Sequence, residues 1–218
     1  MLVFPHDAHT HTTYSDGSGS IGDNVASAEA RGLLLLGITD HGHYMSPGTF
    51  KRYVREVRRW AAESGLVLML GVEGNITENG VDVPEWMARE LDYVIASVHR
   101  RVRTADEYIR LVRTALISGE MDVIGHFGAS FPHVGFPREG ELREVLELAE
   151  AKGVAFEINS SYHVPDVAFL RECIKRGIKL TFASDAHSPG EVGRVGWSER
   201  VFRRAGGKRE DLLFGEIL

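Results

Sequence analysis

Apolar, strand-like runs alternate with amphipathic helical stretches along almost the whole of this 218-residue chain. Seven runs are rich in apolar residues and are bounded by turn residues, which predicts a strand in each. The predicted strands cover residues 6–9, 34–39, 67–72, 92–98, 121–125, 154–158 and 178–183. The predicted helices cover residues 21–32, 48–64, 104–118, 139–151, 165–176 and 191–205. This alternation predicts an α/β fold with a parallel sheet.

Two architectures fit seven strand–helix units, a closed or nearly closed barrel and an open doubly wound sheet. An open sheet gathers its ligand-binding groups near a switch point, from two or three strands. Here every predicted strand carries polar groups at its C-terminal end, and only a barrel brings seven strand ends around one centre. We therefore predict a single-domain (β/α)7 TIM-like barrel over residues 1–218.

Histidines and carboxylates are the polar groups at these strand ends, and together they form a ligand set for divalent transition metals. His9 and His11 are two residues apart. In an extended chain such residues face the same side, so both imidazoles can reach one ion. The candidate ligands are His9, His11, Asp16, His41, Glu73, His99, His126, Asp185 and His187. Nine groups exceed what one ion needs, so the sequence predicts a multinuclear metal site.

The composition narrows the classes of partner and compartment. A formal net charge of −6 argues against a non-specific nucleic-acid binder, but it allows a small anionic substrate held on metal ions. No apolar run approaches the roughly 20 residues of a membrane span, and the first residues lack the pattern of a signal peptide. The single cysteine, Cys173, excludes an intrachain disulfide and is expected to be a buried thiol. We expect a cytoplasmic protein.

Two barrel families carry a His-x-His pair at the first strand. The amidohydrolase superfamily combines it with a bridging lysine or glutamate, two later histidines and an aspartate, for one or two metals. This chain has further candidates, His41 in TDHG and His187 in SDAH. The segments HTHTTYSDG, TDHG, GVE, SVH, GH and SDAH follow in order the motifs of the PHP family (polymerase and histidinol phosphatase domains). From residue 7 to residue 187 the sequence therefore resembles that family.

The resemblance implies a distorted (β/α)7 barrel, which agrees with the strand count, and a centre of three divalent ions. The implied ligands are His9, His11, Glu73 and Asp185 for the first ion, Glu73 as a bridge with His99 and His126 for the second, and Asp16, His41 and His187 for the third. Some family members have histidine where Asp16 stands, and aspartate keeps a ligand there. Zinc, manganese and iron all occur in the family, and the mixed nitrogen and oxygen ligands do not choose among them.

The resemblance also implies phosphate-ester hydrolysis, in which Glu73, Asp185 and His187 are expected to act in catalysis. We expect a metal-dependent phosphatase acting on a small phosphomonoester, with histidinol phosphate as the best single guess. One alternative is a nuclease or nucleotide phosphatase acting on nucleic-acid ends, although the negative charge argues against long polymers. Another is a non-catalytic metal-binding regulatory module, against which the complete ligand set argues. Amidohydrolysis is a further alternative.

Three residues near the same strand ends are candidates for binding substrate. Arg100 directly follows His99, and a guanidinium fork suits phosphate. Arg194 lies just after the SDAH segment, and a surface ion pair is the alternative for either arginine. Asn159 ends a predicted strand and is expected to orient a ligand or to touch substrate.

Other polar and aromatic residues near the strands are expected to be structural. His6 enters the first strand from the opposite end, so it is expected to support the fold. Phe127, Phe131 and Phe136 are expected to pack a loop rather than to recognise a ring.

Overall fold

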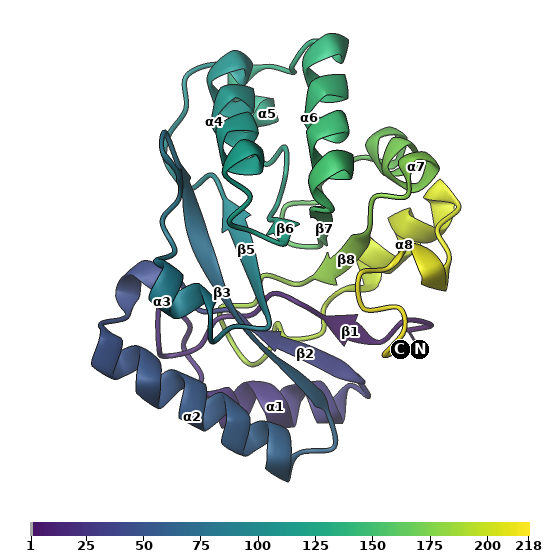
Figure 1. The fold of residues 1–218 in the computed structure, drawn as a ribbon. Coiled ribbons are helices and arrows are strands. Elements are labelled where there is room, and N and C mark those ends of the chain that lie inside the picture. The colour runs from purple at the N-terminus through teal and green to yellow at the C-terminus, as the bar shows by residue number, and fades with distance from the viewer. Residues whose placement is uncertain (1) are drawn as a thin grey trace.

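The structure is a computed structural model that describes residues 2–218. Seven parallel strands lie side by side in the order β1-β2-β3-β5-β6-β7-β8, and β4 pairs with β3 in an antiparallel hairpin (Figure 1). The strands are β1 (His6–Asp7), β2 (Leu35–Ile38), β3 (Val67–Thr77), β4 (Gly80–Val81), β5 (Tyr93–Ser97), β6 (Val123–Ile124), β7 (Ala155–Asn159) and β8 (Leu180–Ala183).

Helices follow most of the strands and cover the outside of the sheet (Figure 1). The α-helices are α1 (Ile21–Ala30), α2 (Pro47–Glu63), α3 (Glu85–Ala88), α4 (Ala105–Ser118), α5 (Phe131–Val134), α6 (Glu139–Lys152), α7 (Val167–Arg176) and α8 (Gly196–Ala205). Two short 3-10 helices are η1 (Gly42–Tyr44) and η2 (Arg209–Asp211). Within residues 2–218, none of the helices combines the length and the apolar character needed to cross a membrane.

The chain just after β1 runs beside β8 and brings the two ends of the sheet together. The Ala8 amide donates to the Phe182 carbonyl at 2.9 Å, and the Asp185 amide donates to the His9 carbonyl at 3.0 Å. Thr10 and Ala186 form a parallel bridge further along. These bonds complete a nearly closed parallel barrel, which confirms the predicted fold class. Its C-terminal strand ends therefore converge on one face.

Strand β3 is longer than predicted. Glu73 was expected to end its strand, but β3 continues to Thr77, so that prediction was wrong. Gly74 and Asn75 pair with β5, and Ile76 pairs with Val81 in the β3–β4 hairpin. Pairing with β5 and β4 therefore carries the strand past Glu73.

The last long helix begins later than predicted. It was expected from residue 191, but α8 begins at Gly196. Residues 188–194 instead form turns, in which the Glu191 amide donates to the Ser188 carbonyl and the Arg194 amide donates to the Glu191 carbonyl. The short elements β4, α3 and α5 were not predicted, because two to four residues carry too little periodicity to reveal an element.

His6 supports the barrel from the N-terminal end of β1, as expected. The fully buried ring stacks on Phe182 with a centroid distance of 4.5 Å, and its Nε2 accepts a hydrogen bond from the Phe182 amide at 3.0 Å. Its Nδ1 lies 3.2 Å from the Phe4 carbonyl. Burial lowers the pKa of His6 to about 4. The ring is therefore neutral in the folded protein at neutral pH.

We expect this burial to make the metal-free protein less stable below pH 6.5. Between pH 6.5 and 4, the imidazole in the unfolded chain takes up a proton that the folded chain excludes, so His6 lowers the free energy of unfolding by about 1.4 kcal/mol per pH unit. His6→Gln, which keeps a hydrogen-bond acceptor, should show a shallower decline in this window. Denaturant unfolding from pH 7 to pH 4 measures both slopes, and His133→Gln at an exposed position is the matched control. Equal slopes for wild type and His6→Gln would contradict the expectation.

Candidate metal centre

The structure brings all nine predicted ligands together at the C-terminal face of the barrel. They come from the segment after β1, the loop before α1, the ends of β2, β5, β6 and β8, and the middle of β3. Three overlapping groups have ligand atoms within 4.8 Å of one another, and the remaining candidates, Asp185 and His126, lie against them. The nine are His9, His11, Asp16, His41, Glu73, His99, His126, Asp185 and His187.

The deepest group consists of His9, His11 and Glu73, which are at most 1% exposed. The Nε2 atoms of His9 and His11 lie 3.0 Å apart, and Glu73 Oε2 lies 3.3 Å from His9 Nε2. Asp185 Oδ1 closes the group at 3.4 Å from His11 Nε2 and 3.8 Å from His9 Nε2. Two imidazole nitrogens and two carboxylates therefore face one small volume.

The two carboxylate oxygens of Glu73 face different sets of histidines. Oε2 lies toward His9 and His11, and also 3.2 Å from His41 Nδ1. Oε1 instead lies 3.1 Å from His99 Nε2 and 3.2 Å from His126 Nε2. This arrangement is what a carboxylate shared between two ions requires.

A third group surrounds Asp16 nearer the surface. Asp16 Oδ2 lies 3.4 Å from His41 Nε2 and 3.5 Å from His187 Nε2, while Oδ1 lies 3.7 Å from His11 Nδ1. The side chains of Asp16 and His187 are 36% and 44% exposed. The centre therefore has a closed inner part and an outer part that is open to solvent.

The residues present fit divalent cations. The Nδ1 atoms of His11 and His41 are buried and have no hydrogen-bond partner among residues 2–218, which is costly unless another group satisfies them. His11 Nδ1 lies 3.7 Å from Asp16 Oδ1, which is too far for a hydrogen bond. His41 Nδ1 lies 3.2 Å from Glu73 Oε2, but the two groups are too poorly aligned for a hydrogen bond. Imidazole nitrogens and carboxylate oxygens are the donors that zinc, manganese and iron accept.

The inner charges are strongly coupled. Burial alone would raise the pKa of Glu73, but His9 and the ring nitrogens of His126 and His99 hold that pKa well below its usual range. Burial would lower the pKa of His9, but the carboxylates of Glu157, Glu73 and Asp185 raise it well above its usual value. Ion binding must displace this proton from His9, so metal affinity should rise with pH.

Glu157 is a buried residue that the sequence reasoning missed. It lies inside β7 at 0% exposure, and its Oε2 is 2.6 Å from His9 Nδ1. Its Oε1 accepts hydrogen bonds from the His126 amide at 3.1 Å and from Asn159 Nδ2 at 2.6 Å. A carboxylate on Nδ1 places the ring proton there and leaves Nε2 free to bind an ion. A charged residue inside an apolar parallel strand was the signal that could have revealed it.

Two further polar residues hold ligands in place. Asn159 is fully buried, and its Nδ2 donates to Glu157 and, at 3.3 Å, to Asp185 Oδ2. It therefore contacts one candidate ligand and the carboxylate that orients another. Asp40 accepts hydrogen bonds from the Thr12 amide and hydroxyl at 2.8 Å and from the Ser15 hydroxyl at 2.7 Å. Asp40 was also missed, and it fixes the loop that carries Asp16.

The two candidate arginines lie at the surface. Arg100 is half-exposed and pairs with Glu78 at 3.2 Å and with Glu107 at 3.6 Å. A contact between Arg100 and phosphate would require these ion pairs to break. Arg194 is exposed on the turn before α8. Substrate binding by Arg100, Arg194 or Asn159 stays a prediction.

Two of the candidate ligands have left-handed backbone conformations. His126 has a φ of 28° and Asp185 a φ of 55°. Such angles are uncommon for residues other than glycine and occur at sites where the surroundings hold them. Each residue lies two positions beyond the end of a short barrel strand, β6 for His126 and β8 for Asp185.

Comparisons with known proteins identify the family of this chain. The family model for the PHP domain matches residues 7–161, more than half of the chain. A protein of Acetivibrio thermocellus named "Probable phosphatase" is 31% identical over 216 residues, which cover 93% of this chain and 86% of the relative. A similarly named protein of Photobacterium profundum is 28% identical and covers 97% and 90%.

Among solved structures, the fold resembles that of a histidinol phosphate phosphatase from Lactococcus lactis, crystallised with zinc, L-histidinol and phosphate. The TM-score is 0.70 at 19% identity, with 94% of this chain and 95% of the other covered. At that identity the likeness concerns the fold alone. With the family match over residues 7–161 and a relative at 31% identity, the chain belongs to the PHP domain family.

Proposed function

We propose that this chain is a metal-dependent phosphatase that hydrolyses a small-molecule phosphomonoester at a centre of three divalent ions. The observation that carries the proposal is the placement of Glu73, whose two oxygens face two sets of histidines, beside a third group around Asp16. Membership in the PHP family and relatives named as phosphatases support the same reaction. The proposed ions are zinc, manganese or iron, and the proposed compartment is the cytoplasm.

The arrangement of the residues suits this chemistry. Bound divalent ions would neutralise the phosphate charge and lower the pKa of a water molecule. Glu73, His9 and His11 form the buried floor of the site. Asp185 and His187 lie between this floor and the surface. His187 Nδ1 lies 2.9 Å from the Asp185 carbonyl oxygen, and its Nε2 faces Asp16. The open outer part leaves room for the ester.

Histidinol phosphate is the proposed first substrate to test. The Lactococcus lactis phosphatase, whose fold this chain shares over most of its length, was crystallised with L-histidinol and phosphate. A panel that also contains mononucleotides and single-stranded oligonucleotides distinguishes a phosphatase of small metabolites from an enzyme acting on nucleic-acid ends. Hydrolysis of oligonucleotides alone would overturn the proposed substrate class.

We expect protein purified without chelator to hold up to three ions per chain. Asp16→Ala should lower this maximum to two, because its nearest contacts, at 3.4 and 3.5 Å, are with His41 and His187 near the surface. Elemental analysis after saturation with each metal measures both values, and Asp106→Ala, at an exposed position on α4, is the matched control. A reproducible maximum of one ion in the wild-type chain would refute the multinuclear centre.

A further inference from the structure

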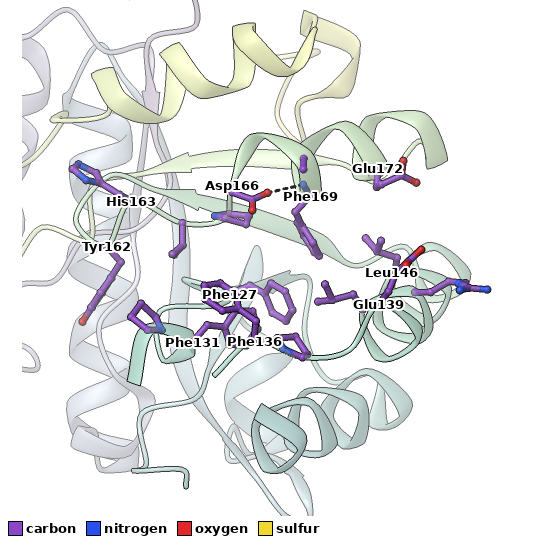
Figure 2. A pocket seen from close by; sticks show the side chains of 18 of the residues that line it. Phe127, Phe131, Phe136, Glu139, Leu146, Tyr162, His163, Asp166, Phe169 and Glu172 are labelled. Atoms are coloured by element: carbon purple, nitrogen blue, oxygen red, sulfur yellow. Dashed lines mark hydrogen bonds between the residues drawn. The ribbon is translucent and has the colours of Figure 1, made fainter. Parts of the chain in front are cut away.

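A cavity of about 600 Å³ lies between helices α6 and α7, on the outer side of the barrel (Figure 2). We call it the α6–α7 groove. Its aromatic wall comes from the segment after β6 and from α7, and consists of Phe127, Phe131, Phe136 and Phe169. This volume lies within the range of sites that bind small organic molecules, and such sites are lined mostly by apolar side chains.

Two residues that line the groove adjoin the metal centre. Phe127 directly follows the candidate ligand His126, and its ring lines the groove. Tyr162, in the loop after β7, also lines the groove, and its ring lies 5.1 Å from the His126 ring. Tyr162 therefore borders both sites.

The mouth of the groove exposes large aromatic side chains to solvent. Phe127 and Phe131 are buried and pack as expected for a loop, but Phe136 is 79% exposed and Tyr162 is 55% exposed. The centroid of the Phe136 ring lies 6.0 Å from that of the Phe131 ring. Exposed apolar surface that continues into a cavity is a mark of a binding site. Phe127 and Phe131 therefore fit the expected role in packing a loop, whereas the exposed Phe136 does not.

The far end of the groove limits what it can hold. Figure 2 shows Glu139 and Glu172 at the end opposite Tyr162 and His163. A long apolar chain entering from the metal centre would reach these carboxylates, whereas a compact ring would stop among the phenylalanines. Glu139 and Glu172 are themselves exposed, and Arg143 and Arg176 also line the groove, so charged groups of both signs accompany its apolar wall. The phenylalanine wall therefore favours a compact ring over a long apolar chain.

We propose that the α6–α7 groove binds the compact, apolar ring of a phosphomonoester whose phosphate occupies the metal centre. This inference rests on the proposed phosphatase function and names the class of alcohol that the phosphatase releases. Loops at the C-terminal ends of β6 and β7 would thus select the substrate, as such loops do in barrel enzymes.

The test compares 2-naphthyl phosphate with glycerol 2-phosphate as substrates of the metal-loaded protein. Ala168→Trp places a large side chain in the groove from an exposed position on α7, and Ala61→Trp, on the exposed side of α2, is the matched control. We expect Ala168→Trp to lower kcat/KM for 2-naphthyl phosphate about tenfold or more and to change that for glycerol 2-phosphate less than twofold, because an apolar pocket discriminates to about this extent. Ala61→Trp should alter neither value.

Binding of 2-naphthol to metal-free protein, followed by its fluorescence, tests the groove without any hydrolysis. Binding to wild type that Ala168→Trp weakens and Ala61→Trp retains would support the groove, even if neither ester is hydrolysed and the proposed function fails. Hydrolysis of both esters with equal efficiency, and no effect of Ala168→Trp on either, would overturn the groove and leave the proposed function intact. Absence of 2-naphthol binding to wild type would also overturn it.

Discussion

Glu73→Ala is expected to abolish phosphatase activity, lowering kcat by about 10³-fold or more, and to remove two of the three ions. Glu73 Oε2 faces His9 and His11, while Oε1 faces His99 and His126, so one substitution removes a ligand from both inner groups. Stabilisation by bound ions is worth several kcal/mol in such reactions, and about 4 kcal/mol corresponds to this loss of rate. The outer group around Asp16 keeps its ligands.

Kinetics, metal content and circular dichroism of Glu73→Ala and Glu73→Gln would be measured together. The glutamine variant keeps the volume of the side chain but lacks its charge, so it separates lost ligation from lost packing. The fold should survive in both variants, because a barrel of this size derives its stability mainly from its apolar core. Turnover close to that of wild type in either variant would show that the bridge lies elsewhere.

Glu157→Gln is expected to weaken metal binding by about 10- to 100-fold, although Glu157 touches no proposed ion position. Its Oε1 accepts from the His126 amide and from Asn159, so the amide oxygen of glutamine must stay on that side. The glutamine NH₂ then faces His9 Nδ1, 2.6 Å from the present carboxylate oxygen. A donor at this position drives the ring proton to Nε2, the nitrogen that faces His11 and Glu73.

Titration of metal-free protein with zinc or manganese measures this affinity directly. Glu199→Gln is the matched control, because Glu199 is also a buried carboxylate that accepts a backbone hydrogen bond, from Val3 at 2.6 Å. Activity of Glu157→Gln should recover at high metal concentration, whereas Glu73→Ala should not recover. Unchanged affinity in Glu157→Gln would show that His9 is oriented by other groups.

The barrel and the set of candidate ligands could be predicted because both depend on short-range patterns. Strand–helix alternation gives the parallel sheet, and spacing such as that of His9 and His11 marks residues that share a face. Glu157 and Asp40 were missed because each supports the centre through contacts with distant residues, for which no local spacing exists. The extension of β3 past Glu73 and the α6–α7 groove likewise depend on how separate segments meet in space.

The left-handed backbone at His126 and Asp185 lowers the stability of the fold at two residues that are proposed to bind metal. Glycine adopts such angles without penalty, whereas other residues pay roughly 1 kcal/mol or more for them. Replacement of either residue by glycine would therefore relieve backbone strain and remove a candidate ligand in the same step. A library of variants selected only for resistance to heat without metal would enrich these glycines, and the more robust proteins it yielded would be the inactive ones.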